Sequence, residues 1–204
     1  MKKVITAVLV IILIGLGYTY YRLNTNLDYN KIYQDFLHNK FESFFDANKE
    51  TLCLKSDFDG FKDSVICDID NDGIKELICV FVPKDSYSPE AMTVKYSNGK
   101  FTLGLGLDID TNMGMGSAWF TEILEKDDLY YIYHLDFGKH YDSDKGVTHT
   151  SEEEVLYIIR GNKKEVIRSF DCSDDKMYLD GKEVNDRQDI KDGYTVVFDS
   201  RKYV

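Results

Sequence analysis

The sequence of 204 residues carries 36 acidic and 25 basic side chains, which gives a net charge of −11. So acidic a surface would repel phosphate, and we expect no nucleic-acid partner. Because the chain has only 2 prolines and no low-complexity run, no linker divides it, and we expect residues 23–204 to form a single domain.

The first 22 residues have the pattern of an export signal. Lys2 and Lys3 precede an apolar run, residues 4–21, which ends in tyrosines. A basic segment followed by an apolar run directs a chain out of the cell. As a helix this run would be about 27 Å long, close to the roughly 30 Å hydrocarbon core of a membrane. We expect residues 1–22 to be an uncleaved, single-pass membrane anchor with the domain outside; the alternative is a signal peptide cleaved after Gly17.

The next segment has the periodicity of an amphipathic helix. Apolar side chains recur about every 3.6 residues between residues 27 and 45, at positions 29, 32, 33, 36, 37, 41, 44 and 45. We predict one helix here, with its apolar stripe buried against a sheet. The alternative is that the stripe binds a partner protein.

Residues 68–77 carry the clearest chemical signal in the chain. They read D-I-D-N-D-G-I-K-E-L, four carboxylates in nine residues around a glycine. Such a concentration of negative charge favours a bound cation, and Ca²⁺ takes six to eight oxygen ligands. The sequence therefore predicts a Ca²⁺ site in loop 68–76. Its ligands are the carboxylates of Asp68, Asp70, Asp72 and Glu76 and the carbonyl of Ile74, with Gly73 allowing the sharp turn.

The residues around this loop predict strands on both sides. Residues 64–67 and 77–82 are apolar and β-branched, and Pro83 ends the second run. An EF-hand instead needs flanking helices and a bidentate Glu at position 12, where this chain has Cys79. The loop resembles the calcium loop of FG-GAP and VCBS-type (integrin-type) repeats. It also resembles a loop found once per chain in small exported clostridial and other Gram-positive proteins of unknown function. That resemblance implies an extracellular, calcium-stabilised β domain. A partial repeat at residues 108–114 suggests a weak second site.

Five hairpins are expected after residue 63. Besides the acidic loop, turns are predicted at residues 98–99, 126–128, 161–162 and 180–181, each between apolar or β-branched runs. Residues 194–198 could add a strand, and residues 184–192 a short helix. The expected fold class is α+β: an N-terminal transmembrane or signal segment, one amphipathic helix, and a curved antiparallel β meander.

Other side-chain groups give weaker signals. His134, His140 and His149 lie near several aspartates but match no metal-ligand spacing, so solvated loop histidines are the simpler interpretation. Cys67 and Cys79 flank the acidic loop; a cross-strand disulfide is conceivable, although buried free thiols are favoured. The spacings of the four cysteines, with Cys53 and Cys172, match no zinc site.

No nucleophile or acid–base constellation stands out, so we expect a protein that is not an enzyme. The expected function is an exported, membrane-tethered bacterial domain with a structural calcium loop, a surface interaction module for an unknown protein or cell-surface ligand. One alternative is an extracellular hydrolase acting on cell-wall or polymeric substrate. Another is an accessory subunit of a membrane complex.

Overall fold

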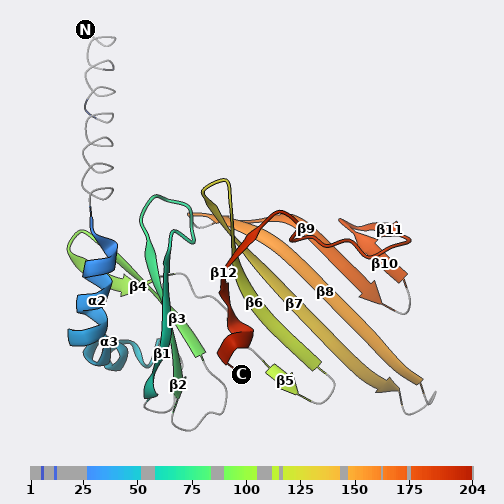
Figure 1. Ribbon diagram of the computed structural model, residues 1–204, viewed down its shortest axis with the longest axis horizontal. Helices are drawn as coiled ribbons and strands as arrows, with labels where there is room; N and C mark the ends of the chain where they lie inside the picture. The colour runs from blue at the N-terminus through green and yellow to red at the C-terminus, as the bar shows by residue number, and fades with distance from the viewer. Residues whose placement is uncertain are drawn as a thin grey trace.

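The computed structural model describes residues 27–51, 58–83, 90–104, 112–114, 117–142, 147–161, 163–173 and 176–203, together with Thr6 and Ile12. Most of these residues are in strands (Figure 1). The elements in chain order are α2 (Tyr29–Asn39), α3 (Phe41–Asn48), β1 (Phe58–Cys67), β2 (Glu76–Pro83), β3 (Glu90–Ser97), β4 (Lys100–Leu103), β5 (Asn112–Gly114), β6 (Ser117–Lys126), β7 (Leu129–Asp142), β8 (Val147–Arg160), β9 (Lys163–Ser173), β10 (Lys176–Leu179), β11 (Lys182–Val184), β12 (Thr195–Asp199) and the 3₁₀ helix η1 (Ser200–Tyr203).

The strands form two antiparallel sheets. Sheet A has the order β1-β2-β3-β4, and sheet B has the order β11-β10-β9-β8-β7-β6-β12, with β5 also paired to β6. All five predicted hairpins are confirmed, and so is the strand at residues 194–198, which is β12. In sheet A, β2 lies between β1 and β3, so the strand after the acidic loop is central, as its continuous apolar run indicates.

The predicted fold class, one helix followed by a single curved meander, is wrong. The structure is mostly β and has two separate sheets, because the chain leaves sheet A after β4 and pairs β6 with new partners. Residues 184–192 form no helix; they continue from β11 into an irregular segment. Hairpin signals are local, and they do not say whether successive hairpins pair edge to edge in one sheet.

The predicted helix 27–45 is two helices with a break at Lys40, whose φ of −131° is not helical. The break does not interrupt the apolar stripe, because the rings of Phe36 and Phe41 meet edge to face across it. The second helix then turns so that Phe45 meets Phe81 of β2, with ring centroids 5.3 Å apart. The expected burial of the stripe against a sheet is confirmed, since residues from both helices share one core with sheet A.

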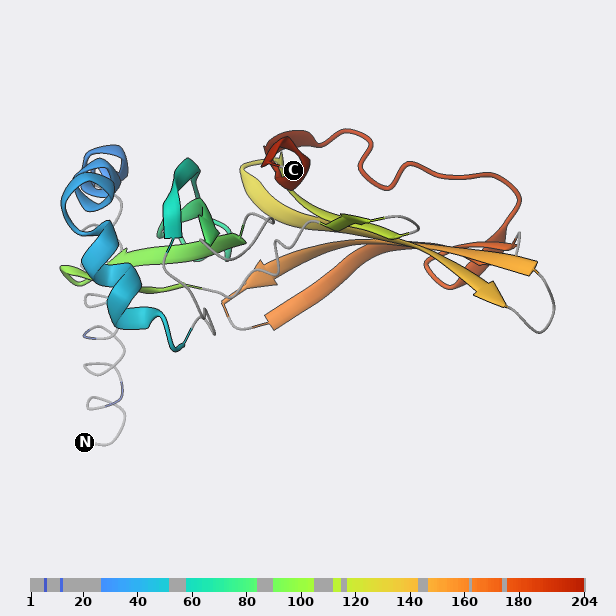
Figure 2. The same cartoon turned by 90° about the horizontal axis from the view of Figure 1, so that it is seen from below.

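The two helices, sheet A and sheet B follow one another across the molecule (Figure 2). Three apolar clusters pack between and against them. Side chains along β2 alternate between the first two: Leu77 faces the helices, whereas Ile78 faces sheet B. In sheet B, Ile123 faces sheet A and its neighbour Leu124 faces the opposite side. The sheets therefore share a core made by residues Cys67, Ile69, Ile78, Val80, Ile123, Ile132, Ile159 and Phe198.

The outer face of sheet B is crossed by residues 185–194, here called the strap (Figure 2). The strap must cross the sheet because β11 and β12 lie at opposite edges. Ile190 inserts into the apolar cluster on this face, and Lys191 Nζ lies 2.6 Å from Glu122 Oε2 on β6. Lys191 also lies 4.3 Å from the ring centroid of Tyr133, so the strap is held by an apolar anchor and by charge.

Within the described part of the chain, no helix has both the length and the apolar character needed to span a membrane. The predicted span, residues 4–21, falls outside the described residues apart from Thr6 and Ile12.

Replacing Lys191 by Met should destabilise the protein by about 1–3 kcal/mol, the usual effect of removing one charged partner from a buried carboxylate. Glu122 is 1 % exposed and would keep only Arg201 as an ion-pair partner among the described residues. Urea denaturation measures the loss, with Lys182→Met on exposed β11 as the control. Equal stability of the two variants would show that the charge does not hold the strap.

Candidate metal centre

The acidic loop connects β1 to β2 in a tight turn. Cys67 and Glu76 are paired across the hairpin, so eight residues reverse the chain between them. Asn71 and Gly73 have φ values of 54° and 88°, in the left-handed region. Glycine adopts that region without steric cost, which confirms the predicted role of Gly73.

Backbone amides of the loop fix the first carboxylates. Asp68 Oδ1 accepts from the amide of Asp72 at 3.0 Å, and Asp68 Oδ2 accepts from the amide of Gly73 at 2.8 Å. Asp72 Oδ1 accepts from the amide of Ile74 at 2.9 Å. These bonds orient the carboxylates before any ligand arrives, because the turn itself supplies the donors.

The carboxylate of Glu76 is held from the other side of the loop. Its Oε2 accepts a buried hydrogen bond of 3.0 Å from the amide of Ile69. Its Oε1 lies 2.7 Å from Lys95 Nζ, but no donor is aligned with it for a hydrogen bond. The side chain is 1 % exposed. A buried carboxylate oxygen without a hydrogen bond is costly, and it marks a position where a cation would be favourable.

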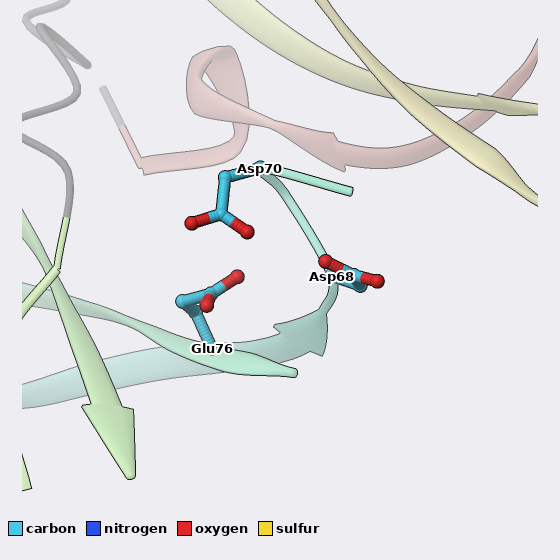
Figure 3. A group of neighbouring side chains, drawn as sticks. All are labelled: Asp68, Asp70 and Glu76. Carbon is cyan, nitrogen blue, oxygen red and sulfur yellow. The ribbon is translucent and has the colours of Figure 1, made fainter. Parts of the chain in front are cut away.

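Asp68, Asp70 and Glu76 together form a group that can hold a metal ion (Figure 3). One oxygen from each lies within 4.8 Å of the others, and the carboxylates of Asp70 and Glu76 point toward one another. Of the five predicted ligands, the structure thus brings three together. Asp72 lies at the more exposed side and joins the group through Lys95, whose Nζ is 2.7 Å from its Oδ2. The carbonyl of Ile74 stays a predicted ligand.

Burial shifts the pKa values of three carboxyl groups in the loop. It raises the pKa of Asp68 and of Asp70, and it raises the pKa of Glu76 to about 8, with Lys95 opposing the shift and Asp70 adding to it. Burial acts to lower the pKa of Lys95, but its contacts with Asp70, Asp72 and Glu76 outweigh this and raise it. The loop therefore holds more negative charge than its surroundings favour.

Charge is balanced differently in the two sheets. On sheet B three acidic side chains form ion pairs with three bases: Glu122 pairs with Lys191 and Arg201, and Glu152 and Glu154 share Arg187. The loop has four carboxylates, and among the described residues Lys95 is the one cation that forms ion pairs with them. It reaches three of the four, those of Asp70, Asp72 and Glu76. The loop, and not the strap face, is short of positive charge.

Asn71 joins the loop to sheet B, a role that the sequence did not reveal. Its Nδ2 donates to the carbonyls of Tyr130 and Ile159, both at 3.0 Å, and its Oδ1 accepts from the amide of Tyr130 at 2.9 Å. The amide of Gly161 also donates to the carbonyl of Asp70 at 3.2 Å. The sequence shows only an Asn at a turn position, and the preference of Asn for left-handed backbone is a sufficient reason for it there.

The other candidate sites do not assemble among the described side chains. His134 Nδ1 lies 3.2 Å from Thr121 Oγ1, and the side chains of His140 and His149 are outside the description, as is most of the segment 108–114. Cys67 and Cys79 are free and buried, which confirms the favoured interpretation. A disulfide between them is excluded by the hairpin register, which pairs Cys79 with Ser64, and by their positions in different apolar clusters.

No family model matches the chain, and neither a curated protein nor a solved structure is found to be similar to it.

Replacing Asn71 by Ala should cost about 2–4 kcal/mol, because three hydrogen bonds are lost and backbone groups of sheet B are left unpaired. Asn98→Ala is the matched control, since Asn98 also has a left-handed backbone, with φ 51°, in the β3–β4 turn. Denaturant unfolding of both variants separates the docking bonds from backbone strain. Losses of equal size would contradict the docking role.

The metal-free protein should lose stability as the pH rises from about 4.5 to about 8. A carboxyl group whose pKa is raised by folding contributes its stability fully below its unfolded pKa and loses it as the pH passes the folded value. Glu76→Gln should flatten this part of the pH profile, measured by urea denaturation in chelator. The exposed Glu183→Gln should leave it unchanged, and a profile unaffected by Glu76→Gln would contradict the prediction.

Proposed function

We propose that this protein is an exported, non-enzymatic domain whose β1–β2 loop binds one structural Ca²⁺ ion. The observation that carries the proposal is the arrangement of loop oxygens. Backbone amides engage both oxygens of Asp68 and one oxygen in each of the other three carboxylates. The second oxygens of those three converge on one point, which Lys95 Nζ occupies in this structure. Buried carboxylate oxygens without nitrogen or sulfur ligands suit a hard cation.

Calcium fits this donor set better than the smaller magnesium ion. The donors are the carboxylates of Asp68, Asp70, Asp72 and Glu76 and the carbonyl of Ile74, all within one turn. Ca²⁺ accepts irregular sets of six to eight oxygens, whereas Mg²⁺ demands near-octahedral geometry and retains its waters. The Ca²⁺ proposal therefore rests on the number and kind of oxygens.

The ion would stabilise the contact between the sheets. Asp70 and Asn71 are adjacent, and both are bonded to sheet B through the carbonyl of Asp70 and the side chain of Asn71. Relieving repulsion among the carboxylates keeps the turn in the conformation that presents Asn71. Metal binding then couples to the stability of both sheets and not of the hairpin alone.

The proposed location follows from the sequence pattern of residues 1–22, which favours export and a membrane anchor. Outside the cell, calcium at millimolar concentration would load a weak site with a Kd of about 10⁻⁴ to 10⁻³ M. The proposed role is interaction with a protein or ligand at the bacterial cell surface.

Two observations favour a binding module over a hydrolase: the place of the pocket, and the ion pairs of the buried acids on sheet B. A pocket of about 360 Å³ adjoins the acidic loop and the start of α2, lined by Tyr29, Gly73 and Lys75 among others. The buried Glu122 and Glu154 on sheet B are both engaged in ion pairs beneath the strap. Neither is an isolated acid facing a substrate cleft.

Calcium should raise the melting temperature. With a Kd of about 10⁻⁴ M, about 10 mM CaCl₂ should add about 2.7 kcal/mol. For a domain of this size that free energy raises the melting temperature by roughly 5–10 °C. The measurement is a thermal melt followed by circular dichroism, in CaCl₂ and in EGTA.

Asp70→Asn should abolish the calcium-dependent shift, because it removes one of the converging carboxylates. Asp186→Asn makes the same charge change on the exposed strap and should keep the full shift. Identical melting temperatures of the unmodified protein in CaCl₂ and in EGTA would refute the calcium proposal.

A further inference from the structure

Lys95 occupies the place where the loop oxygens converge. Its Nζ lies 2.8 Å from Asp70 Oδ2, 2.7 Å from Asp72 Oδ2 and 2.7 Å from Glu76 Oε1. In Asp72 and Glu76 this is the oxygen that no loop amide engages, and in Asp70 the other oxygen accepts only a long contact of 3.3 Å from the amide of Asp72. One ammonium group thus lies within ion-pair distance of an oxygen of each of three carboxylates.

The strand register of sheet A places this ammonium group beside the loop. Lys95 on β3 is the direct cross-strand partner of Glu76 on β2, and it is paired with Thr102 on its other side. The next residue, Tyr96, is held by the hydroxyl of Tyr33, which accepts from the amide of Tyr96 at 3.0 Å. That hydroxyl also donates to the carbonyl of Lys75 at 2.6 Å, so α2 ties the strand of Lys95 to the end of the acidic loop.

An ion and this ammonium group cannot both use the same oxygens. Calcium binds oxygens at about 2.3–2.6 Å. The three carboxylates of the metal-capable group are Asp68, Asp70 and Glu76, and Lys95 contacts two of them. A cation bound to Asp70 and Glu76 would lie within the contact distance of Lys95 Nζ, and two positive charges at that distance repel.

We propose that Lys95 is a tethered cation that competes with calcium for the acidic loop. This inference rests on the proposed calcium function and names its regulation. At low calcium the ammonium group closes the site and keeps the hairpin folded. When calcium binds, the ion takes the oxygens of Asp70, Asp72 and Glu76, and the lysine side chain swings toward solvent, to which it is already partly exposed.

The competition has two consequences. The hairpin keeps its conformation in both states, because a positive charge is present in each, so Asn71 remains docked on sheet B without calcium. The apparent affinity for calcium is lowered by the fraction of molecules in which Lys95 occupies the site. The site therefore binds calcium only at high external concentrations, and calcium binding moves the positive charge of Lys95 to the surface.

Calorimetric titration of the full chain with CaCl₂ tests the proposal through Lys95→Met, which keeps an unbranched side chain one atom shorter and removes its charge. The variant should bind calcium at least about tenfold more tightly, since a site occupied by lysine nine-tenths of the time loses that factor. Its melting temperature in EGTA should fall, because the carboxylates are then left without a cation. Lys100→Met, an exposed lysine on β4, is the control and should change neither value.

The outcomes separate the two proposals. If Lys95→Met binds calcium with unchanged or lower affinity than the unmodified protein, the competition is overturned and the calcium function survives. If only the variant binds calcium, the competition is supported and calcium is not the ligand of the natural loop. If neither protein binds calcium, both proposals fail.

A second measurement needs no substitution. Acetylation of surface amines by an N-hydroxysuccinimide ester, read by mass spectrometry, reports the accessibility of Lys95 in the unmodified chain. Calcium should increase the rate of modification at Lys95 and leave that at Lys100 unchanged. An unchanged or lower rate at Lys95 in calcium would overturn the displacement of the lysine even if Lys95→Met did not fold.

Discussion

The arrangement of this molecule depends on how four carboxylates are accommodated in the nine residues 68–76. Asp68, Asp70, Asp72 and Glu76 are brought together by a backbone that passes through left-handed conformations at Asn71 and Gly73. Burial raises the pKa of three of these carboxyl groups although Lys95 acts in the opposite direction, so their ionised forms are unfavourable in this turn. The positive charge that the structure supplies to this turn comes from Lys95.

The same turn is also the place where the two sheets are joined by hydrogen bonds. The apolar core between the sheets is modest and is confined to the end of sheet B that carries the β6–β7 and β8–β9 turns. Apolar contacts alone are weakly directional. The bonds from Asn71 and from the carbonyl of Asp70 to Tyr130, Ile159 and Gly161 add the specificity that fixes the sheets to each other. Neutralising the loop therefore matters for the whole domain.

Much of the local structure could be predicted from the sequence. Turn residues such as Asn98-Gly99 and Asp180-Gly181 have strong conformational preferences, so the hairpins are encoded locally. The acidic pattern likewise identified Asp68, Asp70 and Glu76, because close spacing along a turn guarantees closeness in space. The alternating burial of β2 on two faces agrees with its unbroken apolar run.

The rest depends on long-range contacts that leave no local pattern. The division into two sheets cannot be seen in any local pattern. The contacts of the strap and of Asn71 join residues more than 30 positions apart. Lys95 is one of many lysines in the sequence, and only the β2–β3 register places it opposite Glu76. No proline or glycine near Lys40 predicts the break between the two helices. The break follows from the packing of Phe41 and Phe45 on sheet A.

The most direct test of the central claim, that the loop is a cation site shared by lysine and calcium, is a crystal structure determined in millimolar CaCl₂. The account predicts one ion with oxygens of Asp68, Asp70, Asp72 and Glu76 at about 2.3–2.6 Å, and Lys95 turned away from it. It would be contradicted by a loop in which, at saturating calcium, the ammonium group still lies between Asp70, Asp72 and Glu76 and no ion is bound.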